Sequence, residues 1–182
     1  MIRSAPVAED ARTQARARAL VATLCGTAAL AIGLATWAIL DGKLPPGGWA
    51  ALGAGILLVA AGVLASRARD ARARFLVSFA DRAFDGAVLA AVAWVSRTAL
   101  PSAAAGAMLA LAAGFLAAYV RARGSALDYL IEEGAGTRAV RIGLVATVLL
   151  AGWTEWALFG VAAWMLLVTL LRVSQVAKEE RA

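Results

Sequence analysis

The sequence predicts an all-α integral membrane protein with six transmembrane helices and an N-terminal juxtamembrane amphipathic helix. Of its 182 residues, 62% are hydrophobic, and the mean hydropathy is +0.77, whereas soluble domains average about 45–50% apolar residues. Charge is absent from four long stretches, at residues 19–40, 44–66, 98–120 and 156–171. The first three are long enough to cross about 30 Å of hydrocarbon, which takes roughly 20 helical residues. The alternation typical of a membrane β-barrel is absent, so the backbone in lipid must be helical.

The chain divides into a cytoplasmic juxtamembrane helix over residues 1–18, a transmembrane domain over 19–176 and a cytoplasmic tail over 177–182. The expected spans cover about residues 19–40, 48–66, 74–97, 102–122, 138–152 and 155–175.

Charged residues and prolines indicate where the N-terminal helix and several of the spans begin. Residues 5–18 are rich in arginine, which predicts a short helix lying on anionic lipid headgroups. The hydrophobic stretch that follows exceeds the roughly 7–15-residue core of a secretory signal, so we interpret it as a retained span. Pro45-Pro46-Gly47-Gly48 predicts the turn before the second span. Pro101 suits the first turn of the fourth span, because proline there loses no hydrogen bond.

The last two spans come from dividing the apolar region 142–171. Gly152-Trp-Thr-Glu155-Trp supplies a helix breaker, a charge and two tryptophans, which favour the membrane interface. This segment therefore predicts a turn.

The longest polar connection runs from Arg121 to Arg141. Gly134-Ala-Gly136 within it predicts a loop, and Thr137 is the candidate N-cap of the fifth span. We expect spans three and five to line one polar cavity that opens to the cytoplasm.

The distribution of basic residues predicts the orientation. Fifteen Lys and Arg residues flank the spans on one side, whereas only Lys43 and Arg97 flank them on the other. The positive-inside rule therefore places both termini in the cytoplasm, for a multi-pass protein of the cell (inner) membrane. The net charge of +6 is explained by this topology. Nucleic-acid binding is not expected, because the basic flanks lack interleaved exposed aromatics.

Two common kinds of chemistry are excluded by composition. The chain has no histidine, so it has no imidazole base and no histidine-ligated metal. Its single cysteine, Cys25, cannot form an intrachain disulfide and has no partners for a thiolate metal site.

Asp81 and Asp85 are the strongest candidates for a functional site, because charges inside a membrane span are costly and rare. They are four residues apart and therefore share one face of a helix. Two interpretations stay open on the residues alone. Asp85 pairs with Arg82 while Asp81 caps a polar interhelical network, or both acids face a cavity and bind a hard divalent cation such as Mg²⁺.

The segment around these acids resembles the third-helix half of the signature of the CDP-alcohol phosphatidyltransferases. The family commonly has F-L-D-S-x-x-D-R-x-x-D, and this chain has Phe75-Leu-Val-Ser-Phe-Ala-Asp81-Arg-Ala-Phe-Asp85. A second match, Tyr119-Val-Arg121-Ala-Arg123 followed by Gly136-Thr-Arg138-Ala-Val-Arg141, is similar to a pattern of the phosphatidylinositol-phosphate synthase and archaeal-type branch. Six spans, an amphipathic N-terminal helix and a cytoplasm-facing cavity also resemble this family.

The resemblance implies transfer of a phosphatidyl-type group from a CDP-linked lipid to an alcohol, with release of CMP, in phospholipid biosynthesis. In the family, Mg²⁺ or Mn²⁺ held by motif carboxylates neutralises the diphosphate, and the last motif acid deprotonates the acceptor. It therefore implies metal and catalytic roles for Asp81 and Asp85. Four residues match basic positions that line the pocket for a polar or phosphorylated acceptor, namely Arg121, Arg123, Arg138 and Arg141. The alternative is that these arginines only anchor the topology.

The chain departs from the signature in its acids. The upstream half, D-x-x-D-G-x-x-A-R, corresponds to residues 58–66, which contain no acid. When the Leu-x-Ser-x-x-Asp-Arg stretch is aligned, the third motif acid falls on Val77 and the fourth on Asp81. An alternative register takes Asp81 and Asp85 as the third and fourth acids, and it also finds no acid in the second span. One or two carboxylates cannot balance the +4 charge of two metal ions. Asp70 is a candidate substitute ligand, although nothing in its spacing requires that role. The signature is therefore degenerate and the metal site incomplete.

Three functions follow as hypotheses. The first is a phosphatidyltransferase with altered metal ligation. The second is a catalytically inactive paralogue that acts as a scaffold or as a partner in a homodimer or in a heterodimer with a homologue. The third, outside the family, is a small transporter or scaffold, although the internal repeats and broken helices typical of transporters are absent.

Overall fold

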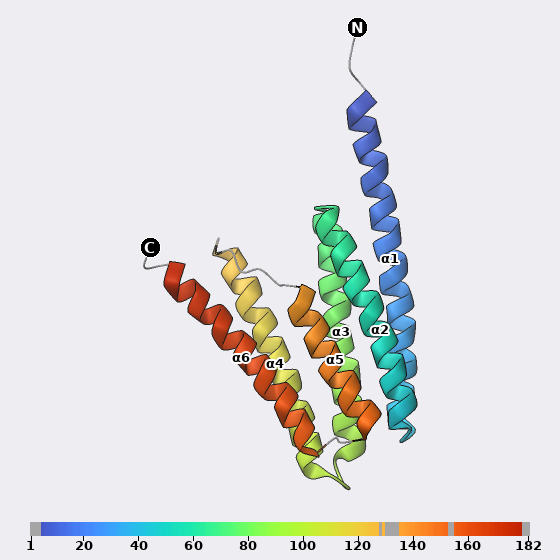
Figure 1. Cartoon of the computed structure of the whole chain (residues 1–182), viewed down its shortest axis with the longest axis vertical. Helices are drawn as coiled ribbons and strands as arrows, with labels where there is room; N and C mark the ends of the chain where they lie inside the picture. The colour runs from blue at the N-terminus through green and yellow to red at the C-terminus, as the bar shows by residue number, and fades with distance from the viewer. Residues whose placement is uncertain (1–4, 128, 130–134, 153–154, 180–182) are drawn as a thin grey trace.

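The computed structural model describes the backbone of residues 5–127, 129, 135–152 and 155–179, and the side chains of residues 13–127, 129, 137–152 and 156–174. This part of the chain forms six α-helices and no strand (Figure 1). They are α1 (Ala5–Leu40), α2 (Leu44–Arg67), α3 (Ala71–Ser96), α4 (Pro101–Ala126), α5 (Ala135–Ala151) and α6 (Glu155–Glu179). The prediction of six successive helical segments is confirmed.

Five of the helices form a ring. Its order is α2, α5, α6, α4 and α3, and each helix packs against its two neighbours in this order. α1 packs on α2 and α3, outside the ring. Helices that are not neighbours in this order, such as α3 and α5, do not pack directly against each other within the described residues. The ring therefore has an interior that only long side chains can bridge.

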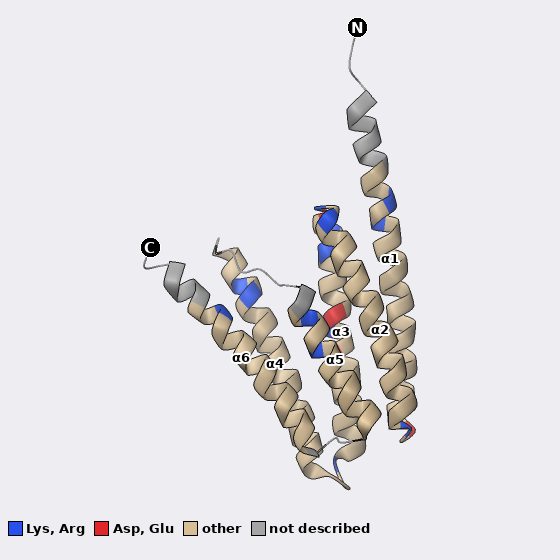
Figure 2. Cartoon of the chain, viewed as in Figure 1, with Lys and Arg blue, Asp and Glu red and all other residues tan. Residues whose placement is uncertain are grey.

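Charge is distributed unevenly along the bundle. α1 begins and α6 ends at the same end of the bundle, where the α2–α3 turn also lies (Figure 1). Most described lysines and arginines lie toward this end or in the middle of the bundle, as Figure 2 shows. We call it the arginine-rich end. It carries the basic flanks on which the predicted orientation depends.

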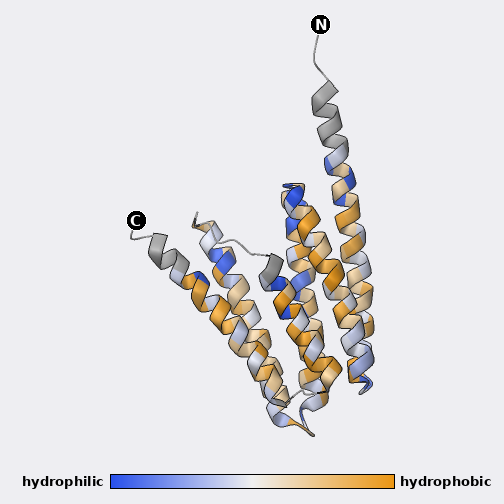
Figure 3. Ribbon diagram, viewed as in Figure 1, coloured by the Kyte–Doolittle hydropathy of each residue, from blue (hydrophilic) through white to orange (hydrophobic). Residues whose placement is uncertain are grey.

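Hydrophobic residues occur along the length of the helices (Figure 3). Small residues fill the helix interfaces of α2 and α4, and many large apolar residues are exposed on the outside. Every buried residue of α4 is alanine or glycine, and Leu58 is the single exception in α2. By contrast, Leu30, Phe75 and Trp156 are 73%, 73% and 75% exposed. Close backbone approach through small residues is typical of helices packed in lipid. This distribution indicates a multi-pass membrane protein.

Four helices are long and apolar enough to cross a membrane, namely α1 from Thr13 onward, α2, α4 and the Trp156–Ser174 part of α6. The other two are limited by length or by charge. α5 has 17 residues, which is about 26 Å at 1.5 Å per residue. α3 carries Asp81, Arg82 and Asp85 in its middle. A six-span topology therefore requires that these charges be sheltered inside the ring.

The expectation of a separate juxtamembrane helix is wrong. α1 runs without a break from Ala5 to Leu40, so residues 5–18 are the first turns of the same helix as the first hydrophobic stretch. The reason is local. Between Pro6 and Gly26 the chain has neither proline nor glycine, and alanine, arginine and leucine favour continuation of the helix.

Two helix starts and one helix end also differ from the prediction. The prolines of Pro45-Pro46-Gly47-Gly48 lie in the first turn of α2, where proline is favourable. The connection between α1 and α2 is formed instead by residues 41–43, with Gly42 at φ 76°. α5 begins at Ala135, so Thr137 is inside the helix and is not its N-cap. Gly134 lies outside the described residues. α6 continues to Glu179, into the predicted tail.

Asp70 links α1 to the start of α3. Its carboxylate accepts hydrogen bonds from the backbone N–H groups of Arg72 (2.9 Å) and Ala73 (3.1 Å), which makes it the N-cap of α3. The same carboxylate forms an ion pair with Arg18 of α1. The Arg18 hydrogen bond, followed by the bonds to the backbone, lowers the pKa of Asp70 below its ordinary value of 3.8.

The close approach of α4 and α6 at Gly106 is testable. A Cβ there would lie 2.9 Å from the Leu158 Cβ and 3.2 Å from the Phe159 backbone nitrogen, so Gly106→Ala forces the two helices apart. We expect a loss of about 1–3 kcal/mol in unfolding free energy, the usual cost of overpacking, measured by titration with SDS in mixed micelles. Gly33→Ala is the control, because a Cβ there meets nothing within 4 Å. An equal loss in both variants would contradict this packing.

The Asp70 contacts predict a pH dependence. Because folding lowers the pKa of Asp70, its charged form stabilises the folded state, fully at pH values above 3.8. This contribution is lost as pH falls below that value through the lowered pKa. We expect Asp70→Asn to be less stable than the original protein at neutral pH, and the difference to shrink on acidification. Thermal unfolding across pH measures it, and a difference that grows with acid would contradict the assignment.

Candidate functional site

Asp81 and Asp85 lie on the face of α3 that points into the ring. Their side chains are only 1% and 2% exposed. They are one helical turn apart, as their spacing predicts. Two carboxylates buried in this way require cationic partners, because an isolated buried charge costs several kcal/mol.

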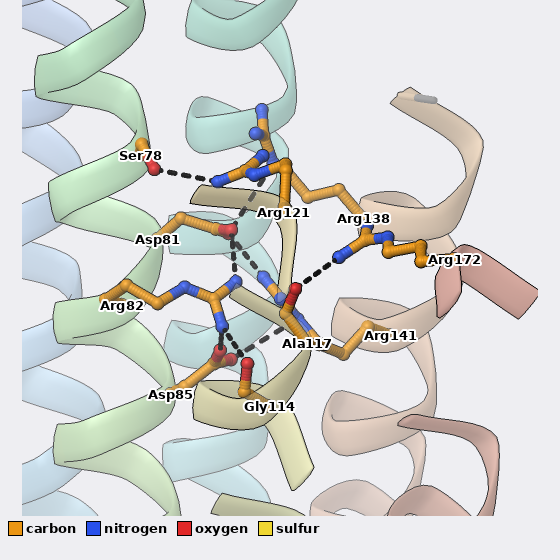
Figure 4. A network of polar contacts seen from close by, with 10 residues as sticks. All are labelled: Ser78, Asp81, Arg82, Asp85, Gly114, Ala117, Arg121, Arg138, Arg141 and Arg172. Carbon is orange, nitrogen blue, oxygen red and sulfur yellow. Dashed lines mark hydrogen bonds and ion pairs between the residues drawn. The ribbon is translucent and has the colours of Figure 1, made fainter. Parts of the chain in front are cut away.

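Three arginines supply these partners, as Figure 4 shows. Arg141 of α5 contacts both acids, with its Nη2 2.5 Å from the Asp81 Oδ1 and its Nε 3.3 Å from the Asp85 Oδ1. Arg82 of α3 also contacts both, at 2.9 Å to the Asp81 Oδ2 and 3.0 Å to the Asp85 Oδ2. Arg138 Nε lies 3.6 Å from the Asp81 Oδ2. These ion pairs connect α3 to α5 across the interior of the ring.

Two further arginines join the group from α4 and α6. Arg121 donates a hydrogen bond to the Ser78 Oγ of α3 (3.0 Å), and Arg172 donates to the Ala117 carbonyl of α4 (2.9 Å). Arg82 also donates to the Gly114 carbonyl, at 2.8 Å. Four helices therefore contribute to one polar group, which we call the arginine cluster. It consists of Asp81, Arg82, Asp85, Arg121, Arg138, Arg141 and Arg172.

Guanidinium groups outnumber carboxylates in the arginine cluster, with five arginines against two aspartates. A small cavity adjoins them, lined by Arg82, Arg138, Arg141, Arg172 and the indole of Trp164, among others. Its volume of about 20 Å³ is room for one or two water molecules. A larger ligand fits only if the arginine side chains rearrange.

Several buried polar atoms of the site have no hydrogen bond among the described residues. They include both carboxylate oxygens of Asp85, the Nε atoms of Arg82 and Arg141, and the indole Nε1 of Trp164. The Asp85 contacts to arginine are thus ionic contacts without hydrogen-bond geometry. Buried polar atoms are normally satisfied, so the site has capacity to bind a further polar group.

The observed arrangement does not suit a centre of two divalent metal ions. No group of three or more acids, cysteines or histidines that could hold a metal occurs among the described residues. Both carboxylates face arginines that compete with a cation for the same oxygens. Metal ligation by Asp81 and Asp85 stays a prediction from the family resemblance, whereas the charge of their surroundings favours an anion.

The predicted site residues fall into two groups. Arg121, Arg138 and Arg141 lie in the arginine cluster with both acids, and Asp85 pairs with Arg82 as the structural interpretation expected. Arg123 is exposed and is not brought to the cluster. Asp70 lies at the start of α3, about 11 residues or 16 Å from Asp81 along the helix.

Nothing in the sequence marks Arg172, Trp164 or Gly62 as part of this site. Arg172 has the same sequence signal as any basic flank of a span, so nothing distinguishes it. Gly62 of α2 lies where a Cβ would come within 2.2 Å of the Arg138 Nη1, so it leaves space for that guanidinium.

Comparison of the chain with protein-family models, with curated proteins and with solved structures gave no match.

The ion pairs of Asp81 make its removal costly. Asp81→Asn leaves Arg82, Arg138 and Arg141 with less compensating charge, so we expect a loss of about 3–5 kcal/mol in unfolding free energy. The matched control is Asp41→Asn, which removes an exposed ion pair to Lys43 (2.7 Å) and is expected to cost less than about 1 kcal/mol. SDS-induced unfolding of both variants measures the difference. Equal, small losses would mean that the cluster is not a stabilising network.

Proposed function

We propose that this chain is a six-span membrane protein of the CDP-alcohol phosphatidyltransferase type whose arginine cluster binds a phosphate-bearing ligand. Both termini face the cytoplasm of the cell (inner) membrane, so the cluster is reached from that side. The ligand is the phosphorylated alcohol acceptor or the CDP-linked lipid of phospholipid biosynthesis. Phosphatidyl transfer itself has been lost, so the protein acts as a catalytically inactive paralogue in a dimer with a second copy or with an active homologue.

The observation that carries this proposal is a small cavity lined by four arginines from three helices, namely Arg82 of α3, Arg138 and Arg141 of α5, and Arg172 of α6. Arg121 of α4 belongs to the same arginine cluster (Figure 4). Guanidinium is planar, stays charged and binds phosphate through paired N–H donors. The Trp164 Nε1, which lacks a hydrogen bond in the described structure, adds a neutral donor on the same cavity wall.

The loss of transfer follows from the acids. Two-metal phosphoryl chemistry needs several carboxylates that are free to bind cations. Here the upstream motif acids are missing, and Asp81 and Asp85 are engaged by Arg82 and Arg141. The remaining residues can bind and orient a phosphate, and they can shield it from lipid.

A binding measurement tests this proposal. Purified full-length protein in nanodiscs is titrated calorimetrically with glycerol 3-phosphate, and with glycerol as the uncharged control. Arg172→Gln is expected to weaken glycerol 3-phosphate binding about tenfold or more, because a hydrogen bond to a charged group contributes about 1.5–3 kcal/mol. Glutamine is two bonds shorter than arginine and does not reach the Ala117 carbonyl from the same backbone position. The unfolding midpoint of the variant is therefore measured alongside, which separates a loss of binding from a loss of folding.

Arg123→Gln is the matched control, since it removes an exposed arginine from the last turn of α4 that is not part of the arginine cluster. Equal weakening in both variants would show nonspecific charge attraction and contradict the proposal.

A second experiment tests the loss of transfer. The unmodified protein is assayed with CDP-diacylglycerol, glycerol 3-phosphate and Mg²⁺ or Mn²⁺. We expect no CMP release. Metal-dependent CMP release that Asp81→Asn abolishes would instead establish an active transferase.

A further inference from the structure

A second basic site lies on the outside of the bundle, at the arginine-rich end. Between the first half of α1 and the α2–α3 turn is an open recess of about 360 Å³. Its lining consists of Gln14, Arg18, Arg69, Asp70, Ala71 and Arg72. It is formed because α1 continues as a straight helix beyond the end of α2, which leaves a corner beside the turn (Figure 1).

The charges of this recess are unequally paired. Arg18 and Asp70 neutralise each other. Arg69 and Arg72 are exposed, and neither side chain forms an ion pair or hydrogen bond with any described residue. Two guanidinium groups therefore face the recess without a counterion.

The backbone at Arg69 is held in an unusual conformation. Its φ of 51° makes it the one described residue other than glycine with a positive φ. Such a conformation costs about 1 kcal/mol or more for a residue with a side chain. The turn directs Arg69 next to Arg72, so both arginines line one recess.

An apolar stripe continues from the recess along the outside of α3. Phe75 and Phe79 follow Arg72 at helical spacing and are 73% and 64% exposed. A guanidinium at one end of an exposed apolar stripe matches the two parts of a phospholipid, with the phosphate at the interface and the acyl chains below it. A soluble phosphate would not need the phenylalanines.

We propose that the recess binds the headgroup of an anionic phospholipid, with the phosphate between Arg69 and Arg72 and an acyl chain along Phe75 and Phe79. This site is separate from the arginine cluster. Asp81 lies nine residues beyond Arg72, which is about 14 Å along α3 and inside the ring. The bound lipid fixes the depth of α3 in the membrane and holds α1 against the α2–α3 turn.

Native mass spectrometry of the detergent-solubilised full-length protein tests the site. Retained lipid is counted after addition of phosphatidylglycerol or phosphatidylcholine. We expect preferential retention of phosphatidylglycerol and at least a tenfold weaker apparent affinity in the double variant Arg69→Gly, Arg72→Gln. Glycine suits the positive φ, so this variant is expected to fold, which its unfolding midpoint checks. Glycerol 3-phosphate at the same concentration is expected not to displace the lipid.

The matched control is the double variant Arg67→Gln, Arg74→Gln. It removes the same charge from exposed positions of the same segment that do not line the recess. Equal loss in the two double variants, or equal retention of the two lipids, would overturn the proposal. Displacement by glycerol 3-phosphate would replace the lipid with a soluble phosphate ligand. The Arg172→Gln variant keeps this lipid, so the two sites fail independently.

Discussion

The pairing of charge inside an apolar bundle is the constraint on which the rest of this structure depends. Asp81 and Asp85 are almost fully buried, and carboxylates in such surroundings are tolerated only with cations beside them. Arg82 is supplied by the same helix, but Arg141 comes from α5, which is separated from α3 in the ring by α2. The ion pairs thus connect two helices that do not pack on each other, and these are the two that are least suited to lipid by length or charge.

Small residues make this arrangement possible. Alanine and glycine bring α4 close to α6 and α2 close to its neighbours, and Gly62 leaves space for the Arg138 guanidinium. Neighbouring helices of the ring pack tightly against each other, while long charged side chains fill the interior of the ring. Packing and electrostatics therefore fix the same geometry, in which the five guanidinium groups are held close together.

Much of the fold could be predicted from the sequence, because uncharged stretches and prolines such as Pro101 mark the helices directly. The continuity of α1 is not evident from composition, because the change from an arginine-rich to an apolar segment suggests a boundary although both segments favour helix. The site could be predicted only in part. Asp81 and Asp85 are conspicuous inside a span, whereas Arg172 has no sequence signal that separates it from Arg123. Which basic flank turns inward depends on how the ring closes, and this is a property of tertiary packing.

The most direct test of this account is a double-mutant cycle between Asp81 and Arg141. The unfolding free energies of Asp81→Asn, Arg141→Gln and the double variant are measured by SDS titration in mixed micelles. We expect a coupling energy of about 2 kcal/mol or more, because each single variant leaves a buried charge without one of its partners. The double variant should therefore lose at least about 2 kcal/mol less than the sum of the two single losses. Additive losses would contradict the claim that this buried ion pair holds α3 and α5 together.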